Sequence, residues 1–473
     1  MKTFFQILLM ACLGSLTDVS TLLANTKPII INIDNPKFRK LVTAVPVLET
    51  DPGGPGMESF GNKFAVELRR YMEFSGFFKV LREAGLKGLE KKSASLSPAA
   101  LKIAGFEGID LRQWQAIGVE SLTVGKLIRQ KDGKYRLELR TADVTRGVRV
   151  LGKAYTLNQL SEAEQALKKY ADRLLMAYTN RPGIFNSKIV FVGKKTPTSQ
   201  KQIYMCDVDG SNVRQLTFAN SLHLSPAFSP DGNKVLYTSY ESGNPDLYML
   251  DLVAQKTEKI AGYQGLNSGG VFSDNGKLIA FSGSIKGNTE IYLRDFVSKK
   301  RRPLLGGHGI DVDPAFSPDG KWLAFVSGRY GNPHIFKASL EWNQDRSQVK
   351  VIRDTRLTYA GWYNATPSWS PDSGKLAFAG FDKDIGRFDL FLMNHDGTKM
   401  ERLTLNSGDN ESPAWSPNGQ LIIFHSNRIA PRGARKGPPQ LFMMNRDGSH
   451  QQVIPTGLYA AETPRWGPFV LND

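Results

Sequence analysis

The sequence contains very little cysteine, and its few histidines are scattered. Among 473 residues there are two cysteines, Cys12 and Cys206, and six histidines. Cys12 lies in an N-terminal apolar stretch that we expect to be removed. The remaining thiol can form neither an intrachain disulfide nor a cysteine-rich zinc site. No two histidines have the H-x-x-x-H or H-E-x-x-H spacing of a helical zinc site. We therefore expect no metal site.

The motifs of several large enzyme classes are also missing. The chain has no G-x-S-x-G nucleophile elbow, and the region before residue 183 has neither a G-x-G-x-x-G fingerprint nor a P-loop. The glycine-rich segment 51–56 contains two prolines, which lack the backbone N–H groups that hold a phosphate. These absences predict a protein with no catalytic residue and no cofactor. The alternative is a lyase-type or glycosidase-type enzyme with clustered histidines and carboxylates.

Long apolar runs are absent beyond the N-terminus. Lys2 precedes an apolar stretch from Phe4 to Leu16, broken only by Gln6, Gly14 and Ser15, and an expected cleavage exit follows at 22–24. This pattern is typical of an export signal, and the stretch is too short for a stable membrane anchor. We expect an exported protein whose signal, residues 1–24, is cleaved near Ala24. Lipid attachment at Cys12 is the alternative.

Positive charge is in excess but is not concentrated. The chain has 61 Lys and Arg against 45 Asp and Glu, a formal net charge of +16. Such a balance is compatible with nucleic acid, anionic lipid or an acidic protein partner. The densest basic run, residues 299–302, has only four members. We therefore expect no nucleic-acid partner, and membrane association only through other proteins.

Residues 25–182 mix the periodicities of strands and helices. Apolar residues between Phe60 and Met72 are spaced three or four apart, which predicts a helix. Ser161 and Glu164 have the spacing of a capping box and predict the start of a second helix. Runs of strand-forming residues occur at 29–33, 41–48, 77–81, 135–140 and 148–157. We predict a small α/β domain.

From about residue 187 onward the chain repeats a unit that begins with a proline and an aromatic residue, continues with Ser-Pro-Asp-Gly and then has a short apolar strand. The repeat positions are marked by Ser229, Ser273, Ser317, Ser370, Ser416 and Gly467, at steps of 44, 44, 53, 46 and 51 residues. A period of about 45 residues is typical of a propeller with one four-stranded blade per repeat. The fold class that we predict is therefore mixed, an N-terminal α/β domain followed by a six-bladed β-propeller at 187–473.

The two ends of the repeat region complement each other. Lys188–Val192 has the pattern of a second strand without its inner strand, and Pro464–Trp466 has the pattern of an inner strand alone. We expect these segments to pair and close the ring, which removes a free sheet edge. Trp369, Trp415 and Trp466 precede the turns at a fixed position. This position favours packing between blades over a platform for sugars.

The whole pattern resembles the TolB family, periplasmic components of the Tol–Pal envelope system. Six boxes of this type behind a small α/β domain and an export signal carry the resemblance. Further matching segments are Ile29-Ile30-Ile31-Asn32-Ile33-Asp34, Ala44-Val45-Pro46, Leu68-Arg69-Arg70 and Gly76-Phe77-Phe78. The resemblance implies a periplasmic binding protein and no enzyme, with a role in outer-membrane integrity and in constriction at cell division.

The resemblance also implies two partners. The first is the peptidoglycan-associated lipoprotein Pal, bound by propeller loops that enter the inner strands and join the second and third strands. The second is TolA of the inner membrane, bound by a segment near the mature N-terminus whose alternating isoleucines suit strand addition. The expected Pal-binding residues are His223, Ser225, Asn267, Ser268, Asp311, Asp313, Asn364, Thr366, Asn410, Glu411, Glu462 and Thr463. The expected TolA-binding residues are Ile29, Ile31, Ile33 and Asp34.

Some alternatives remain open. His223 is either a surface loop residue or a partner contact at the channel mouth. A related propeller that binds a surface polysaccharide is a second rival to the scaffold interpretation. Three departures from the family pattern concern the Ser-Asp-Asn-Gly box at Ser273, the Trp-Gly-Pro box at Trp466 and the long basic connector 427–439.

Overall fold

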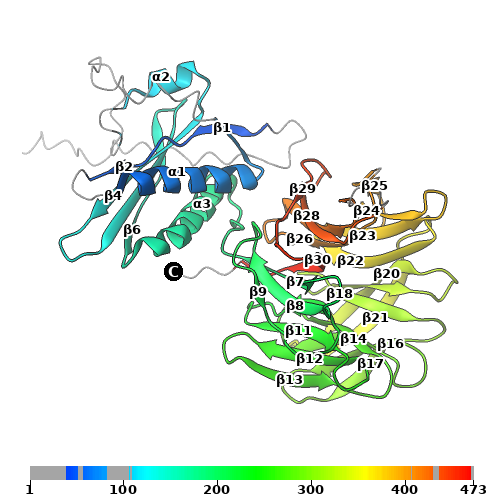
Figure 1. Cartoon of the computed structure of the whole chain (residues 1–473). Coiled ribbons are helices and arrows are strands. Elements are labelled where there is room, and N and C mark those ends of the chain that lie inside the picture. The colour runs from blue at the N-terminus through cyan, green and yellow to red at the C-terminus, as the bar shows by residue number, and fades with distance from the viewer. Residues whose placement is uncertain are drawn as a thin grey trace, which may run out of the picture.

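The computed structural model describes residues 39–51, 57–81, 106, 109–405, 407–429 and 436–469. They form an N-terminal domain beside a ring of sheets (Figure 1). The export signal and the segment Ile29–Asp34 lie outside the described residues. Within the described part of the chain, no helix has both the length and the apolar character needed to cross a membrane.

The N-terminal domain is a mixed sheet covered by two long helices. The strand order is β3-β1-β4-β5-β6, and β2 pairs with β4. The pairs β1–β3, β1–β4 and β2–β4 are parallel, and β4, β5 and β6 are antiparallel. The elements are β1 (Leu41–Ala44), β2 (Glu49–Thr50), α1 (Met57–Phe74), β3 (Phe78–Val80), α2 (Leu111–Ala116), β4 (Ser121–Arg129), β5 (Tyr135–Asp143), β6 (Val148–Leu157) and α3 (Ala163–Thr179). The apolar stripes of α1 and α3 join one core.

Two local predictions in this domain are wrong. The predicted capping box does not form, because Ser161 belongs to a short 3₁₀ turn (Leu160–Glu162) and α3 begins only at Ala163. Glu162 precedes α3 without a side-chain capping bond, and its Oε2 accepts the N–H of Asn158 at 2.9 Å instead. The strand expected at 41–48 ends at Ala44, before Pro46, which has no N–H for a ladder.

The propeller consists of six four-stranded sheets, which confirms the predicted fold class. Five sheets use consecutive strands. The first two sheets are β10 (His223–Phe228), β11 (Lys234–Ser239), β12 (Asp246–Asp251) and β13 (Lys256–Ala261), and β14 (Asn267–Phe272), β15 (Leu278–Gly283), β16 (Glu290–Asp295) and β17 (Arg301–Leu305). The next two are β18 (Asp311–Phe316), β19 (Trp322–Ser327), β20 (His334–Trp342) and β21 (Val349–Arg356), and β22 (Tyr363–Trp369), β23 (Lys375–Asp382), β24 (Arg387–Asn394) and β25 (Glu401–Arg402). The fifth is β26 (Asn410–Trp415), β27 (Leu421–Ser426), β28 (Gln440–Asn445) and β29 (Gln452–Val453).

The sixth sheet closes the ring as the sequence predicts. Its order is β30-β7-β8-β9, formed by β30 (Ala460–Trp466), β7 (Lys188–Lys194), β8 (Gln202–Asp207) and β9 (Arg214–Gln215). The last strand is antiparallel to the first, with Ala461 opposite Gly193 and Trp466 opposite Ile189. The C-terminal strand therefore covers an edge of β7 that would otherwise be free.

The ring has two different faces. The turn face carries the turns that join first to second strands and third to fourth strands. The loop face carries the loops that join second to third strands and one blade to the next. The N-terminal domain packs against the turn face, where Arg70 Nη2 lies 2.8 Å from Asp209 Oδ2 and Arg181 Nη1 donates to the carbonyl of Asn418 at 3.2 Å. One apolar core runs through this junction from α3 into β7 and β8.

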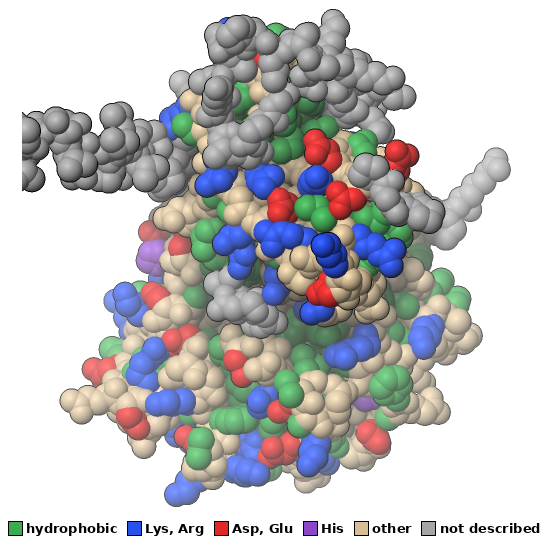
Figure 2. All heavy atoms as spheres, turned by 90° about the vertical axis from the view of Figure 1, so that its left-hand side faces the viewer, with side chains coloured by type: hydrophobic (Ala, Val, Ile, Leu, Met, Phe, Trp, Pro, Cys, Tyr) green, Lys and Arg blue, Asp and Glu red, His purple; other side chains and the backbone are tan. Residues whose placement is uncertain are grey.

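Charged side chains of both signs cover the side of the molecule that includes the N-terminal domain. Figure 2 shows many Lys and Arg side chains across the middle of this side, with Asp and Glu between them. On β5, the carboxylate of Glu138 contacts Arg136 Nε and Arg140 Nη2, both at 2.7 Å. These contacts hold the pKa of Glu138 below its usual value.

Candidate partner-binding surface

Each inner strand of the propeller carries the same backbone irregularity. One residue in each inner strand has a positive φ, between 45° and 64°. The pairing register between the inner strand and the second strand of the blade shifts at this residue. A positive φ is easily reached by glycine and costs free energy for other residues. The six positions are Ser225, Gly269, Asp313, Thr366, Ser412 and Thr463. Each bulge bends the strand where it reaches the loop face.

The expectation that the Pal-binding residues lie in propeller loops is wrong. All twelve lie in the first halves of the inner strands β10, β14, β18, β22, β26 and β30. Five are at most 3% exposed, namely His223, Asn267, Asp311, Asn364 and Asn410. The strands are longer toward the loop face than the apolar pattern indicates, because polar side chains that bond to nearby backbone are buried there.

These buried polar side chains hold the loops that precede them. Asn267 Nδ2 donates to the carbonyl of Tyr263 at 2.6 Å, and Asn364 Nδ2 donates to the carbonyl of Ala360 at 2.9 Å. Asn410 Nδ2 donates to the carbonyl of Ser407 at 2.9 Å. An asparagine thus fixes the preceding loop in three blades. The result is a set of loops with fixed starting geometry, which suits recognition by a rigid surface.

His223 takes part in a similar arrangement. Its Nδ1 lies 3.1 Å from the carbonyl oxygen of Ser221, and its Nε2 lies 3.3 Å from Ser239 Oγ. Burial lowers the pKa of His223, so the ring is neutral at neutral pH. The interpretation of His223 as a surface loop residue is therefore wrong, since only 2% of it is exposed.

Four polar groups meet at the loop-face end of the seam between β26 and β30. His425 Nε2 lies 3.9 Å from Glu411 Oε1, and His425 Nδ1 accepts the N–H of Thr463 at 3.3 Å. Glu462 on β30 pairs with Lys201, which lies in the loop between β7 and β8 of the same sheet. Burial, together with Asp409 and Glu462, raises the pKa of Glu411 to about 7. Burial lowers the pKa of His425 to about 4. Two expected site residues, Glu411 and Glu462, are thus brought together.

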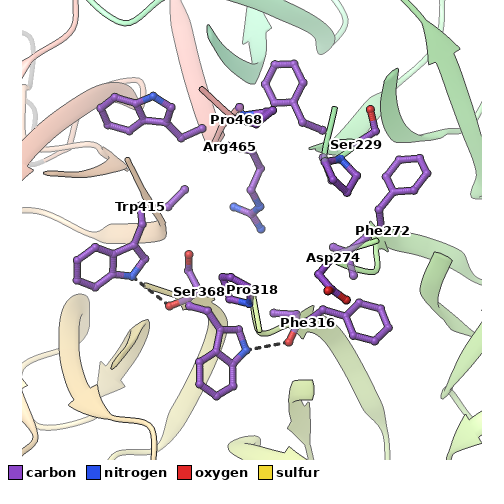
Figure 3. A pocket seen from close by; sticks show the side chains of 18 of the residues that line it. Ser229, Phe272, Asp274, Phe316, Pro318, Ser368, Trp415, Arg465 and Pro468 are labelled. Carbon is purple, nitrogen blue, oxygen red and sulfur yellow. Dashed lines mark hydrogen bonds between the residues drawn. The ribbon is translucent and has the colours of Figure 1, made fainter. Parts of the chain in front are cut away.

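The centre of the ring is a channel of about 500 Å³, lined by the inner strands and the Ser-Pro turns. Figure 3 shows the Arg465 side chain reaching into it. The other five blades place a small residue at this position: Ala227, Val271, Ala315, Ser368 and Ala414. Burial lowers the pKa of Arg465 and raises that of Asp313, which also lines the channel. Among the described residues, no group of three His, Cys, Asp or Glu side chains is placed to hold a metal ion.

Two of the three tryptophans before the turns form hydrogen bonds with the neighbouring blade, and the third bonds to the residue before β7 of its own sheet. Trp369 Nε1 donates to the carbonyl of Ala315 at 2.9 Å, and Trp415 Nε1 donates to that of Ser368 at 3.2 Å (Figure 3). Trp466 Nε1 donates to Ser187 Oγ at 2.7 Å. The prediction of packing between blades is confirmed for Trp369 and Trp415.

The loop face carries many large apolar side chains that water reaches. All but Tyr363, the first residue of β22, come from loops between second and third strands or from loops between blades. The exposed members are Phe218, Tyr240, Ile310, Tyr330, Tyr359, Trp362, Tyr363, Ile385, Leu405, Ile429 and Tyr459. Sequence reasoning missed this set because it searched these loops for polar tips. The available signal was an aromatic or aliphatic residue within otherwise polar loops.

Comparison with known proteins agrees with this geometry. Residues 176–470 match the family model of the TolB beta propeller domain, and residues 29–150 match that of the TolB amino-terminal domain. The chain belongs to the TolB family.

Individual TolB proteins match to different extents. A Tol-Pal system protein TolB from Hydrogenovibrio crunogenus is 36% identical over 393 residues, which cover 83% of this chain and 85% of that protein. Another from Desulfosudis oleivorans is 32% identical over 218 residues. The chain spans about half the length of several curated relatives that it matches, the Desulfosudis oleivorans protein among them. The crystal structure of TolB from Acinetobacter baumannii superimposes with a TM-score of 0.73 and 26% identity, covering 91% of this chain and 97% of that one.

Local hydrogen bonds and ion pairs accommodate two departures from the TolB pattern. In the box without proline, Ser273 Oγ donates to Asn275 Oδ1 at 2.8 Å, and Asp274 forms two contacts of 2.9 Å with Arg346. The described ends of the basic connector are also held. Arg428 Nη2 donates to Asn410 Oδ1 at 2.5 Å, and Lys436 pairs with Asp409. Residues 430–435 of the connector lie outside the described part of the chain.

Proposed function

We propose that this chain is the TolB component of a Tol–Pal envelope system. In this role it is an exported periplasmic scaffold that catalyses no reaction. Its loop face binds a Pal-like peptidoglycan-associated lipoprotein, and its N-terminal segment binds a TolA-like protein of the inner membrane. The two contacts link the outer membrane and cell wall to the inner membrane, support outer-membrane integrity and assist constriction at division. Membership of the TolB family supports this proposal.

One observation carries the choice of the loop face for Pal. The N-terminal domain occupies part of the turn face through Lys168, Arg70 and Arg181, whereas no described residue of that domain makes a comparable contact with the loop face. The loop face also carries the exposed aromatic side chains. Clusters of exposed apolar side chains on a soluble domain mark sites of interaction. The half-buried Ser225, Ser268, Asp313, Thr366, Glu411, Glu462 and Thr463 then form the floor of the site, and the buried polar residues act by holding its loops.

The proposed TolA contact rests on the sequence pattern alone. Ile29, Ile31 and Ile33 alternate with Ile30 and Asn32 and are followed by Asp34, a pattern that suits a strand that pairs with an exposed sheet edge. The edge can belong to a TolA-like protein or to this chain's own sheet, in which β3 and β6 are the outer strands. A choice between these two edges would let one partner control the other.

Crosslinking in intact cells tests the Pal contact. A photoreactive amino acid replaces Tyr240 or Tyr359 on the loop face, or Val253 or Val297 on the turn face, all four being exposed. Positions His223 and Asn267 are unsuitable, since a bulky probe there would disturb the packing. We expect an adduct with a Pal-like lipoprotein from the loop-face positions only. Adducts from the turn-face positions alone would contradict the proposal. No lipoprotein adduct, combined with turnover or retention on polysaccharide, would favour the rival functions.

A further inference from the structure

Exposed aromatic side chains are concentrated on two neighbouring blades of the loop face. Tyr330 lies in the loop between β19 and β20 and is 70% exposed. Tyr359 and Trp362 lie in the loop between β21 and β22 and are 73% and 50% exposed. Arg356 connects these two loops, because its guanidinium lies 5.9 Å from the ring centre of Tyr330 and 4.8 Å from that of Tyr359.

A second cation approaches the same group from the next loop. Lys383, between β23 and β24, places its Nζ 4.7 Å from the ring centre of Trp362. We call Tyr330, Arg356, Tyr359, Trp362 and Lys383 the aromatic–cation cluster. Three loops from two neighbouring blades thus contribute to the cluster, and the loop that carries Tyr359 and Trp362 connects its two cation–ring groups.

The cluster is held before any partner arrives. Arg356 Nε donates to the carbonyl of Thr358 at 2.7 Å, and Trp362 N donates to the carbonyl of Phe381 at 3.0 Å. The buried Asn364 holds the same loop through Ala360. Side chains that are already ordered lose little entropy on binding, which raises the affinity that each contact can supply.

The two cations of the cluster differ from their neighbours in charge pairing. Elsewhere on the loop face, Lys259 Nζ lies 2.7 Å from Asp246, and Arg329 Nη1 lies 2.7 Å from Asp354. Within the described part of the chain, no ion pair to a carboxylate joins Arg356 or Lys383. Asp382, beside Lys383 in the chain, accepts the N–H of Asp384 at 2.9 Å and so stabilises the turn to which it belongs. The cluster therefore presents two cations outside the ion pairs of the described residues, together with apolar surface.

We propose that the aromatic–cation cluster is the hot spot of the loop face and that it binds a carboxylate-bearing protein segment of the Pal-like partner. This inference rests on the function proposed above and specifies where and by which chemistry that partner is held. Trp, Tyr and Arg are the residues that dominate protein interfaces energetically. A guanidinium held on an aromatic ring can still form two hydrogen bonds with a carboxylate. A glycan fits less well, since the ring faces that would stack on a sugar are partly covered by cations.

Binding between the purified full-length protein and the purified Pal-like lipoprotein of the same organism, without its lipid, tests the inference. We expect Trp362→Ala to weaken the affinity by about tenfold or more. Arg356→Gln and Lys383→Gln should each weaken it several-fold and should reduce its dependence on salt. Phe218→Ala is the matched control, an exposed aromatic residue of the same face outside the cluster. It should change the affinity by less than about twofold.

The outcomes separate the inference from the function on which it rests. If the unmodified protein binds the lipoprotein and the cluster variants bind as tightly as the control, the hot spot is wrong and the proposed function survives. If the unmodified protein does not bind it, the proposed function fails, and the inference fails with it. Stronger loss for Trp362→Ala with polysaccharide than with lipoprotein would also overturn the inference. Melting temperatures of all variants check that the fold is intact.

Discussion

Lys168 shows how a single residue connects the two domains. It lies on α3 and is only 3% exposed, yet its ammonium group contacts Asp207 at the end of β8 as well as Glu164 Oε1 at 2.7 Å. Asp207 is also buried and is further bonded to Lys188 and Asn212. A buried carboxylate that loses one of its cations keeps its desolvation cost. This contact is therefore sensitive to substitution.

We expect Lys168→Met to lower the free energy of unfolding by about 3 kcal/mol, because it leaves Asp207 partly unpaired in the domain junction. Lys63→Met on α1 is the control, since Lys63 is exposed and its Nζ lies 4.0 Å from Glu67, at the limit of an ion pair. Its expected effect is below about 0.5 kcal/mol. Urea unfolding measures both. Equal effects would show that the buried contact does not stabilise the junction.

The raised pKa of Glu411 predicts that the stability of the protein depends on pH. Its pKa is raised to about 7 by burial, Asp409 and Glu462, while Lys436 acts in the opposite direction. His425 faces it with a pKa lowered to about 4 and is uncharged at neutral pH. A carboxylate with a raised pKa destabilises the fold when ionised, so its cost is complete above pH 7. The cost fades as the pH falls toward about 4.5, where the unfolded chain also takes up the proton.

Glu411→Gln should therefore be more stable than the unmodified protein at pH 8 and nearly equal to it at pH 5. The gain at pH 8 should not exceed about 1 kcal/mol, because the side chain is 36% exposed and water screens the charge. Thermal unfolding at both pH values measures the difference, with Glu241→Gln as an exposed carboxylate control on the same face. A gain that is the same at pH 5 and pH 8 would exclude ionisation of Glu411 as the cause.

At the scale of elements, left-handed backbone positions differ in the space around them. Gly269 has a φ of +64°, and a Cβ there would meet only Ser282 Oγ, at 3.7 Å. Other blades place serine, threonine or aspartate at the equivalent position. Gly210, in the turn between β8 and β9, has a φ of +83°, and a Cβ there would lie 2.7 Å from the carbonyl oxygen of Pro455. Both glycines have a left-handed backbone conformation, but only at Gly210 is there no space for an added Cβ.

This contrast predicts different costs for the same substitution. Gly269→Ala should destabilise the protein by about 1 kcal/mol, the cost of a left-handed backbone without a clash. Gly210→Ala should cost about 3 kcal/mol, because the backbone of the neighbouring blade must also move. Denaturant midpoints measured side by side give the comparison. If Gly269→Ala costs as much as Gly210→Ala, backbone strain rather than space dominates both sites.

At the scale of the molecule, the ring depends on its last strand. β30 pairs with β7, and its Trp466 reaches Ser187 at the entrance to the propeller. A chain that ends after Tyr459 should leave β7 with a free edge, and size-exclusion chromatography should detect association or loss of soluble protein. Addition of a peptide with the sequence 460–469 should restore the monomer by strand addition, whereas a scrambled peptide should not. A truncated chain that stays monomeric and folded without the peptide would contradict this role of closure.

Much of this architecture could be predicted because it repeats. Each blade carries its own turn box and alternating strands, so the signal for six sheets and for ring closure occurs several times in the chain. The capping box at Ser161 failed because it is a single local pattern, and a 3₁₀ turn before α3 satisfies the same backbone differently.

The sequence by itself determined the propeller, its closure and the family, since repeated local patterns need no knowledge of distant contacts. Only the tertiary structure decided which polar residues of the inner strands are buried and which loop residues form a surface. His223 and Asn267 bond to backbone close to them and are covered by neighbouring strands, so their polarity did not mean exposure. Tyr330 and Tyr359 belong to different loops and meet through Arg356, and Lys383 of the next blade reaches Trp362, only because these loops lie side by side in the ring. Burial and such meetings depend on packing between segments distant in the chain, which no local pattern records.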